Sequence, residues 1–286
     1  MKKVNLPLVA SALTLLFVTI TFLHAGEPGY RETRIKWKRE RISRGLLWIH
    51  AHTVEGDTLK QNINILIVDT RKKVIDIVYE PGQGRRKADI QAAEAGGTAA
   101  VNGGFFNAAG GSVTYLRNDG IIHDTDTATA WPRNANLNGA VMVEGTGRVH
   151  LIPRATNEWF DKNSQFIDIL VSGPVLLLDG MAAEMPGTSL VTARHPRTAI
   201  GLKGKRKVML VTVDGRTVQS HGLTLHQMAD LMLSLGCSDA VNLDGGGSTT
   251  MWIEGKAHGG IVNMPCDNKQ FDHEGARAVS SVIVVR

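Results

Sequence analysis

Cysteine is scarce in this sequence, and the separation of its two cysteines excludes a common class of metal site. Cys237 and Cys266 are the only cysteines among 286 residues, whereas zinc sites closed by thiolates draw their ligands from closely spaced pairs. The two residues either form a disulfide, which would close a loop of about thirty residues, or lie apart as two buried thiols. No metal or other cofactor is predicted, although the oxygen groups around a glycine-rich loop are of the kind that bind Ca²⁺, so a bound Ca²⁺ ion is not excluded.

Motifs of several common enzyme and binding classes are also missing. The chain has neither a Walker loop nor a dinucleotide-binding fingerprint. Gly247-Ser248 does not stand in the Gly-x-Ser-x-Gly turn of α/β-hydrolases. Aromatic residues make up 5% of the chain, and they do not interleave with the basic stretches at 31–44 and 71–86 as a base-stacking surface requires. Nucleic acid is therefore not a predicted partner.

The first 25 residues have the pattern of an export signal. Lys2 and Lys3 precede an apolar run from Leu6 to Leu23, and small residues precede Gly26. Cleavage there predicts a periplasmic or secreted protein without stable membrane insertion. The alternative is an uncleaved anchor, because the apolar run is nearly long enough to span a bilayer. Removing the signal reduces the net charge from +5 to +3, with 30 basic and 27 acidic residues remaining.

The rest of the chain predicts one α+β domain. Hydrophobic residues make up 43% of the sequence, which is enough for a sizeable core. We expect a polar lead segment at 26–45 and a catalytic domain at 46–286, with a mixed, largely antiparallel β-sheet core flanked by a few helices. The clearest helix spans 225–235, with Thr224 as its N-cap and Gly236 as its end. A second helix is expected at 85–94, and a strand at 112–117.

The stretch from Asn242 to Thr249, Asn-Leu-Asp-Gly-Gly-Gly-Ser-Thr, is the strongest candidate for an active site. Three glycines, Gly245, Gly246 and Gly247, remove every side chain that would keep a ligand from the backbone, and their N–H groups favour an anion. Ser248 and Thr249 add hydroxyl donors. Asn242 and Asp244 share one face of the preceding strand, so both are expected to point into one cleft.

Other short motifs add groups that bind anions. His195 and Arg197 stand in a basic cluster before a predicted strand, and a guanidinium suits phosphate in a bidentate grip. Asp214 and Arg216 follow another strand, where they either belong to the site or form a turn with a local ion pair. Asn102 ends a buried strand before two glycines.

Together these pieces resemble the phosphodiester glycosidase family, over roughly residues 95–285. The resemblance implies that the site consists of Asn102, Arg197, Asp214, Arg216, Asn242, Asp244 and Gly245 to Gly247. It is carried by Val101 to Phe106, Gly173-Pro174 with Asp179-Gly180, His195 to Gly201, Val213 to Arg216, Gly222 to Leu225, Asn242 to Thr249, and Arg277.

The implied activity is hydrolysis of the glycosidic bond in a sugar-1-phosphodiester, such as one of N-acetylglucosamine. A phosphate monoester leaves with little need of a proton because its second pKa is about 6. Asp244 would serve the oxocarbenium-like transition state, and Asp214 would act as a general base or orient an arginine. Two alternatives stay open: a non-catalytic module that binds anionic or phosphorylated envelope glycans, and a hydrolase of another glycosidic or P–O bond.

Overall fold

Strands dominate the computed structural model, which describes residues 36–53, 60–124 and 135–286. The predicted export signal at 1–25 lies outside these residues. Within them, no helix is long and apolar enough to cross a membrane.

The largest sheet is built from the apolar, β-branched runs of the sequence. Its central strands are buried on both faces, which explains why the second half of β3, Ile65 to Val68, is a continuous apolar run rather than an alternating one. In spatial order its eight strands are β1 (Lys38–Ser43), β2 (Leu46–Thr53), β3 (Gln61–Asp69), β15 (Lys207–Val213), β14 (Arg197–Lys203), β16 (Asp239–Asn242), β12 (Val175–Leu178) and β13 (Met181–Ala182).

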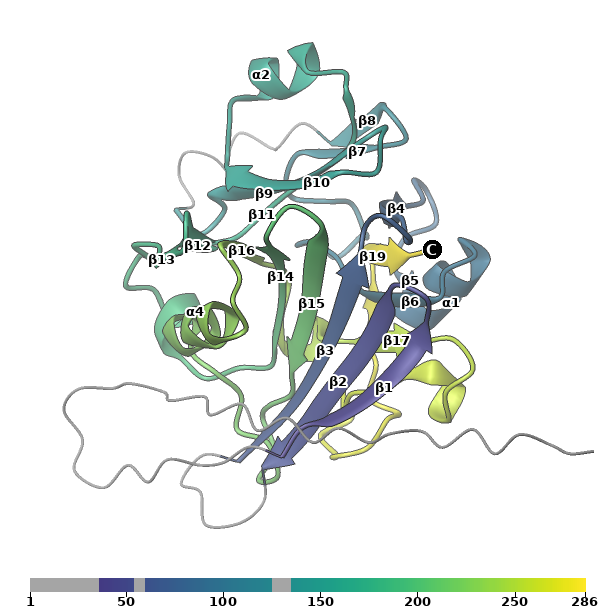
Figure 1. Ribbon diagram of the computed structural model, residues 1–286, viewed down its shortest axis with the longest axis vertical. Helices are drawn as coiled ribbons and strands as arrows, with labels where there is room; N and C mark the ends of the chain where they lie inside the picture. The colour runs from purple at the N-terminus through teal and green to yellow at the C-terminus, as the bar shows by residue number, and fades with distance from the viewer. Residues whose placement is uncertain (1–35, 54–59, 125–134) are drawn as a thin grey trace, which may run out of the picture.

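Three smaller sheets complete the β-structure. The five-stranded sheet, at the top of Figure 1, has the order β10 (Val149–Pro153), β9 (Gly139–Glu144), β11 (Phe166–Ser172), β7 (Leu116–Asn118) and β8 (Ile121–Asp124). The four-stranded sheet has the order β17 (Met251–Ile253), β6 (Ala99–Asn102), β19 (Ser281–Val285) and β4 (Ile75–Tyr79). The last sheet pairs β18 (Ala278–Val279) with β5 (Arg86–Lys87).

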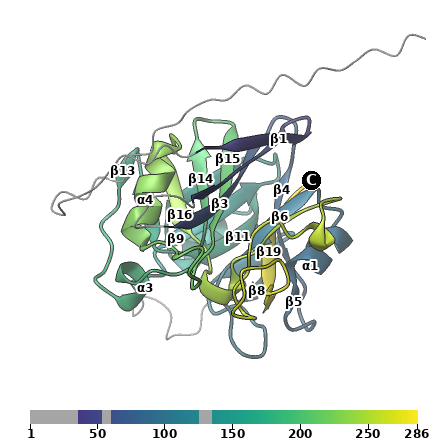
Figure 2. The same cartoon turned by 90° about the horizontal axis from the view of Figure 1, so that it is seen from below.

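The helices are few and cover the outside of these sheets. Figure 2 shows α4 on one side of the molecule and α1, close to the C-terminal strands, on the other. They are α1 (Ala88–Glu94), α2 (Asn157–Lys162), α3 (Ser189–Thr192) and α4 (Leu225–Ser234), with 3₁₀ turns η1 (Gly246–Ser248) and η2 (His258–Gly260).

Two apolar clusters hold the layers together. The first joins residues of all three larger sheets, for example Leu66, Val141 and Ile283. The second packs α4 against the other face of the eight-stranded sheet, through residues such as Met228 and Val211. The large sheet is therefore covered on both faces, and its strand ends and loops carry the remaining polar groups.

The predicted α+β domain with a largely antiparallel core is confirmed. Every pairing between the strands named above is antiparallel, and the parallel pairing in the described residues is one bridge between Cys266 and Gly275. The α4 prediction is confirmed as well: the Thr224 side chain accepts from the Gln227 N–H and the Gln227 side chain accepts from the Thr224 N–H, which completes a capping box.

The structure refines three local predictions. Residues 38–43 of the predicted polar lead form β1, which pairs with β2 at the edge of the large sheet, where polar residues are suited to solvent; residues 26–35 lie outside the described residues. The strand expected at 112–117 begins only at Leu116, since the Ser112 hydroxyl donates to the Thr114 carbonyl and holds a turn. The two cysteines are free and buried, so the separate thiols are the alternative that the structure supports.

Candidate active site

The predicted site segments converge at one end of the eight-stranded sheet. Arg197, the first residue of β14, lies opposite Val213, the last residue of β15, and Asn242 ends the neighbouring strand β16. Because β14 runs antiparallel to both neighbours, its beginning meets their ends. The loops that follow Val213 and Asn242 therefore leave the sheet side by side.

Asn102 fastens the four-stranded sheet to this point. Its side-chain Nδ2 donates to the Asp244 carbonyl at 2.7 Å, and its Oδ1 accepts from the Thr198 hydroxyl at 2.7 Å and from the Thr250 N–H at 3.1 Å. The residue is fully buried. Asn102 thus positions the backbone of the loop from Asp244 to Thr249, hereafter the Asp loop.

Most N–H groups of the Asp loop are used within the protein. Gly245 donates to the Asp244 carboxylate at 2.9 Å, and Gly246 donates to the Pro196 carbonyl at 2.9 Å. Ser248 and Thr249 donate back to the carbonyls of Gly245 and Gly246 in the 3₁₀ turn. These four groups form no open nest for an anion, because each already donates to an acceptor of the protein.

The glycines instead make room for neighbouring groups. A Cβ at Gly245 would stand 2.7 Å from the Pro196 carbonyl oxygen, and one at Gly246, where φ is 61°, would stand 3.0 Å from Nη2 of Arg216. A Cβ at Gly247 would overlap both Asp267 and Arg277. Three consecutive glycines therefore let a carbonyl and two arginines approach the backbone next to Asp244.

Asp244 is the carboxylate around which these groups gather. Burial raises its pKa to about 6, although the Ser248 hydroxyl, the Gly245 N–H and the guanidiniums of Arg277 and Arg216 all favour the ionised form. A carboxylate with a pKa in this range is mostly ionised at neutral pH and can still take up a proton, which suits general acid–base chemistry.

Arg216 reaches the Asp loop from a strained backbone position. Its φ of 63° is unusual for a residue with a side chain, and such a conformation costs about 1 kcal/mol. The guanidinium lies over Gly246 and against Nδ1 of His195, with N···N distances of 3.3 and 3.4 Å. His195 accepts at Nδ1, so its proton stands on Nε2, and burial with the nearby Arg197 and Arg216 lowers the pKa of this histidine.

Arg197 lies deeper than the sequence predicted. Its guanidinium donates to the backbone carbonyls of Leu190, Ala193 and Leu223 at 2.7 to 2.8 Å, and the residue is 1% exposed. Burial, with a smaller effect of Arg216, lowers the pKa of Arg197 to about 10, so the group stays cationic at neutral pH. Its donors on three carbonyls stabilise the loops beside the site.

Asp214 is more deeply buried than Asp244, and its carboxylate accepts three hydrogen bonds. Asn263 Nδ2 donates to Oδ1 at 2.7 Å, while Asn62 Nδ2 and the Met264 N–H donate to Oδ2 at 2.7 and 2.8 Å. Burial raises the pKa of Asp214 to about 7 despite these donors. Asn263 donates in addition to the Thr249 carbonyl at 3.0 Å, so Asp214 connects β15 and β3 to the far side of the Asp loop.

Asn242 and Thr249 turn into the protein interior. Asn242 Nδ2 donates to the Gly173 carbonyl at 2.8 Å, while its Oδ1 and the Thr249 hydroxyl are buried without a hydrogen-bond partner in the part of the chain that the structure describes. Asn242 therefore braces the strand before the loop, and its side chain does not share the surroundings of Asp244.

Arg277 is the group that the sequence analysis left without a role. It forms a two-pronged ion pair with Asp267, with both N···O distances at 2.7 Å, directly over Gly247. Its charge lowers the pKa of Asp244. Arg277 stands among the residues that carry the family resemblance, and that was its only signal, because a lone arginine before a strand has no local pattern.

The described residues contain no group of three His, Cys, Asp or Glu side chains placed to hold a metal ion. The structure thus brings together Asp244, Gly245 to Gly247, Ser248, His195 and Arg216, adds Arg277, and places Asn102, Arg197, Asp214, Asn242 and Thr249 behind them.

Comparison with known sequences identifies one family. The profile of the phosphodiester glycosidases matches residues 95–286. N-acetylglucosamine-1-phosphodiester alpha-N-acetylglucosaminidase of Bos taurus is 28% identical over 230 residues, which cover 73% of this chain and 42% of that protein, and the Homo sapiens enzyme matches equally well. An uncharacterized prophage-derived protein of Bacillus subtilis, YomE, is 43% identical over 74 residues, 26% of this chain and 12% of that protein. The chain spans less than half of the length of these relatives.

Solved structures share the fold. The catalytic domain of the zebrafish N-acetylglucosamine-1-phosphodiester alpha-N-acetylglucosaminidase, described as auto-inhibited by its pro-peptide, aligns with a TM-score of 0.67 at 19% identity, covering 96% of this chain and 87% of that one. A hypothetical protein from Synechocystis aligns with a TM-score of 0.58 at 16% identity, covering 88% of this chain and 64% of that one.

Proposed function

Because the chain belongs to the phosphodiester glycosidase family, we propose that it hydrolyses the glycosidic bond of a sugar-1-phosphodiester and releases the sugar. The observation that carries this proposal is the placement of two guanidiniums beside the Asp244 carboxylate: Arg216 lies over Gly246, and Arg277 lies over Gly247. Two guanidiniums beside the Asp244 carboxylate, one of them paired with Asp267, suit a substrate that carries its negative charge next to the reacting carbon.

The arginines would hold the phosphate. Their planar forks each present several N–H donors to phosphate oxygens, and they also offset the charge that builds up as the phosphate leaves. Little protonation of the leaving group is needed, since the second pKa of a phosphate monoester is about 6. We therefore assign the phosphate grip to Arg216 and Arg277, with Arg197 as a positioning residue behind them.

Asp244 would act on the anomeric carbon. Above its pKa of about 6 the carboxylate is ionised and can attack that carbon or stabilise an oxocarbenium-like transition state. Asp214 accepts hydrogen bonds at both oxygens, so we assign it to holding the Asn263 segment against the Asp loop. His195 orients Arg216 through Nδ1 and offers the Nε2 proton to a substrate oxygen.

The experiment uses the methyl phosphodiester of N-acetylglucosamine-1-phosphate in ¹⁸O-labelled water. Release of N-acetylglucosamine with label on the anomeric hydroxyl supports the proposal, and the anomer first formed, read by NMR, distinguishes retention from inversion. Label in the phosphate would instead identify a phosphodiesterase. Binding without release of any sugar, on this and a panel of related sugars, would favour the non-catalytic binding module.

We also propose that the protein is exported through residues 1–25, which lie outside the described residues. The lysine pair and apolar run of this segment support the proposal. Intact mass spectrometry of the protein from an exported fraction should find a chain that begins near Gly26, and an N-terminus at Met1 in a membrane fraction would support the anchor alternative.

A further inference from the structure

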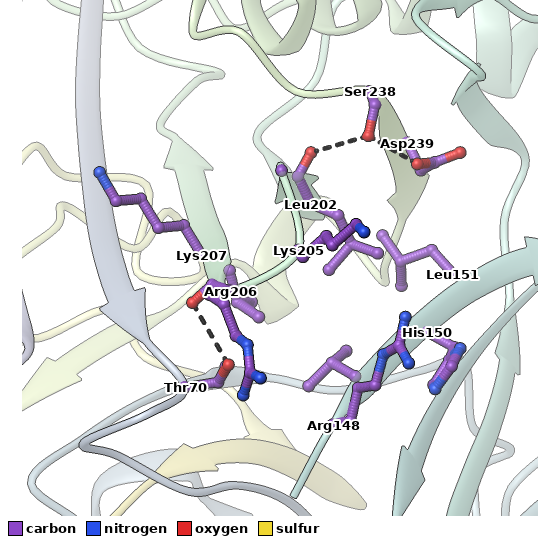
Figure 3. Close-up of a pocket in the computed structure, with 13 residues that line it drawn as sticks. Thr70, Arg148, His150, Leu151, Leu202, Lys205, Arg206, Lys207, Ser238 and Asp239 are labelled. Carbon is purple, nitrogen blue, oxygen red and sulfur yellow. Dashed lines mark hydrogen bonds between the residues drawn. The ribbon is translucent and has the colours of Figure 1, made fainter.

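A second concave and strongly basic region lies away from Asp244. It is a cavity of about 370 Å³ between strand β10 and the turn that joins β14 to β15. We call it the basic hollow; Arg148, His150, Lys205, Arg206 and Lys207 supply its basic side chains. Figure 3 shows the side chains of Arg148, Lys205 and Arg206 around one space, while the Lys207 amine extends away from it.

The positive charges of the basic hollow are poorly neutralised. Among the ion pairs of the described residues, none involves Arg148, Lys205 or Arg206. The His150 ring pairs with Glu144 at 2.6 Å, and that carboxylate also accepts from the Thr146 hydroxyl and partly offsets the charge of Arg148. Asp239, the one acidic residue of the lining, accepts from the Ser238 hydroxyl at 2.7 Å and from the Asp179 N–H at 3.2 Å.

Cations without ion pairs are common on flat protein surfaces. Here the cations surround a concave region, and they come from two different sheets. Arg148 comes from the turn before β10 in the five-stranded sheet, and Lys205 with Arg206 comes from the β14–β15 turn of the eight-stranded sheet. The Thr70 N–H and hydroxyl both donate to the Arg206 carbonyl, at 2.9 and 3.2 Å, and hold that turn in place. Like charges gathered around a hollow concentrate their field on a ligand inside it.

The basic hollow and Asp244 stand at opposite ends of the same strands. Lys203 and Lys207 pair at one end of β14 and β15, and Arg197 and Val213 pair at the other. Six residues of extended strand separate the two ends, which is about 20 Å. A single small sugar phosphate cannot occupy both places, whereas a chain of several repeats has the length to do so.

We propose that the basic hollow is a second substrate-binding site, which takes the phosphate groups of a poly(sugar-phosphate) or poly(polyol-phosphate) chain while Asp244 acts elsewhere on that chain or on its end. The inference deepens the proposed function and rests on it for the identity of the substrate. Two guanidiniums and an ammonium suit phosphodiesters repeated along a flexible polymer, because each phosphate can meet one cation without a fixed register.

The test measures polymer binding and catalysis separately. The full chain is titrated calorimetrically with poly(glycerol phosphate), inorganic phosphate and uncharged dextran at 50 and 300 mM NaCl. The triple variant Arg148→Gln/Lys205→Gln/Arg206→Gln is compared with Lys207→Gln, which removes one charge of the same lining that points away. All four side chains are exposed, so thermal unfolding should be nearly unchanged.

We expect the triple variant to bind poly(glycerol phosphate) about tenfold more weakly at 50 mM NaCl, and Lys207→Gln to remain within about twofold. At 300 mM NaCl the wild-type protein should bind the polymer more weakly, and most of the difference in affinity between the wild type and the triple variant should disappear. Turnover of the small methyl phosphodiester should not change in the triple variant. Inorganic phosphate that binds as tightly as the polymer would mean that the hollow recognises a single free anion, which overturns the polymer proposal.

Equal polymer affinity of the wild-type and triple-variant proteins would also overturn it. The proposed function is judged independently with Asp244→Asn, which should keep polymer binding and lose cleavage. If the wild-type protein cleaves no substrate but the triple variant binds the polymer more weakly than the wild type, the proposed function fails and the basic hollow stands as a polyanion-binding site.

Discussion

Replacing Arg277 by glutamine tests the group that the structure added to the site. The change removes the ion pair with Asp267 and the positive charge beside Asp244, while the side chain keeps a polar end over Gly247. The ion pair itself is a weak stabiliser, because its side chains are 39% and 36% exposed. We expect a loss of at most about 1 kcal/mol in the free energy of unfolding.

The effect on catalysis should be much larger. Loss of one charged donor that faces a developing negative charge typically lowers turnover by roughly 100-fold. The acid limb of the pH profile of kcat/KM should also move up from about 6, because Arg277 lowers the pKa of Asp244. Both readouts come from initial rates on the methyl phosphodiester between pH 4 and 9, with stability from urea unfolding at pH 7.

Arg71→Gln is the matched control. Arg71 makes the same two-pronged contact with Asp69, through N···O distances of 2.9 and 2.6 Å, at the end of β3. It should lose a similar amount of stability and keep full activity. Our reasoning is refuted if Arg277→Gln retains activity within threefold and leaves the acid limb in place, since Arg277 would then be structural only.

Three further predictions concern the residues around the Asp loop. Asp244→Asn should lower kcat/KM by about a thousandfold or more. Burial raises the folded-state pKa of Asp244 to about 6, so this group stabilises the wild type below its unfolded pKa near 4, and that stability is lost as the pH rises through 6. In urea unfolding at pH 8 the variant should therefore be more stable than the wild type by about 1 to 3 kcal/mol. Gly246→Ala should cost about 1 kcal/mol for its positive φ and reduce kcat/KM by displacing Arg216, whereas Gly255→Ala, which also has a positive φ but open space around its Cβ, should cost the same and leave kinetics unchanged. Asp214→Asn should lose about 3 kcal/mol in urea unfolding at pH 5, since its amide must face an N–H donor of the buried network. This pH lies below the Asp214 pKa of about 7, so the cost of burying a charge does not offset the effect, and a loss below 0.5 kcal/mol would contradict the network.

The sequence alone was enough to predict the fold class, and it singled out the Asp loop as the candidate site. Helix α4 was predictable because its cap, apolar face and terminal glycine are local features that agree with one another. Strand runs with turns between them indicated an antiparallel core. The Asp loop stood out because three glycines in a row cost entropy that an ordinary turn does not require.

Only the tertiary structure decided which side chains face Asp244. Arg197 and Arg216 look alike in the sequence, yet one donates to three carbonyls and the other lies over Gly246. Arg277 joins the site from a loop more than thirty residues later. Asn62 supports Asp214 from β3, in a part of the chain that the family motifs do not cover.

The physical reason for this division is the range of the interactions. Capping, periodicity and turn chemistry act between residues a few positions apart, so a sequence displays them directly. Burial, desolvation and the contact of a charge with a distant loop depend on how the sheets pack, and no local pattern records them. The three glycines are visible in the sequence as a candidate site, while only their neighbours in space show that they admit arginines beside the partly buried Asp244 carboxylate.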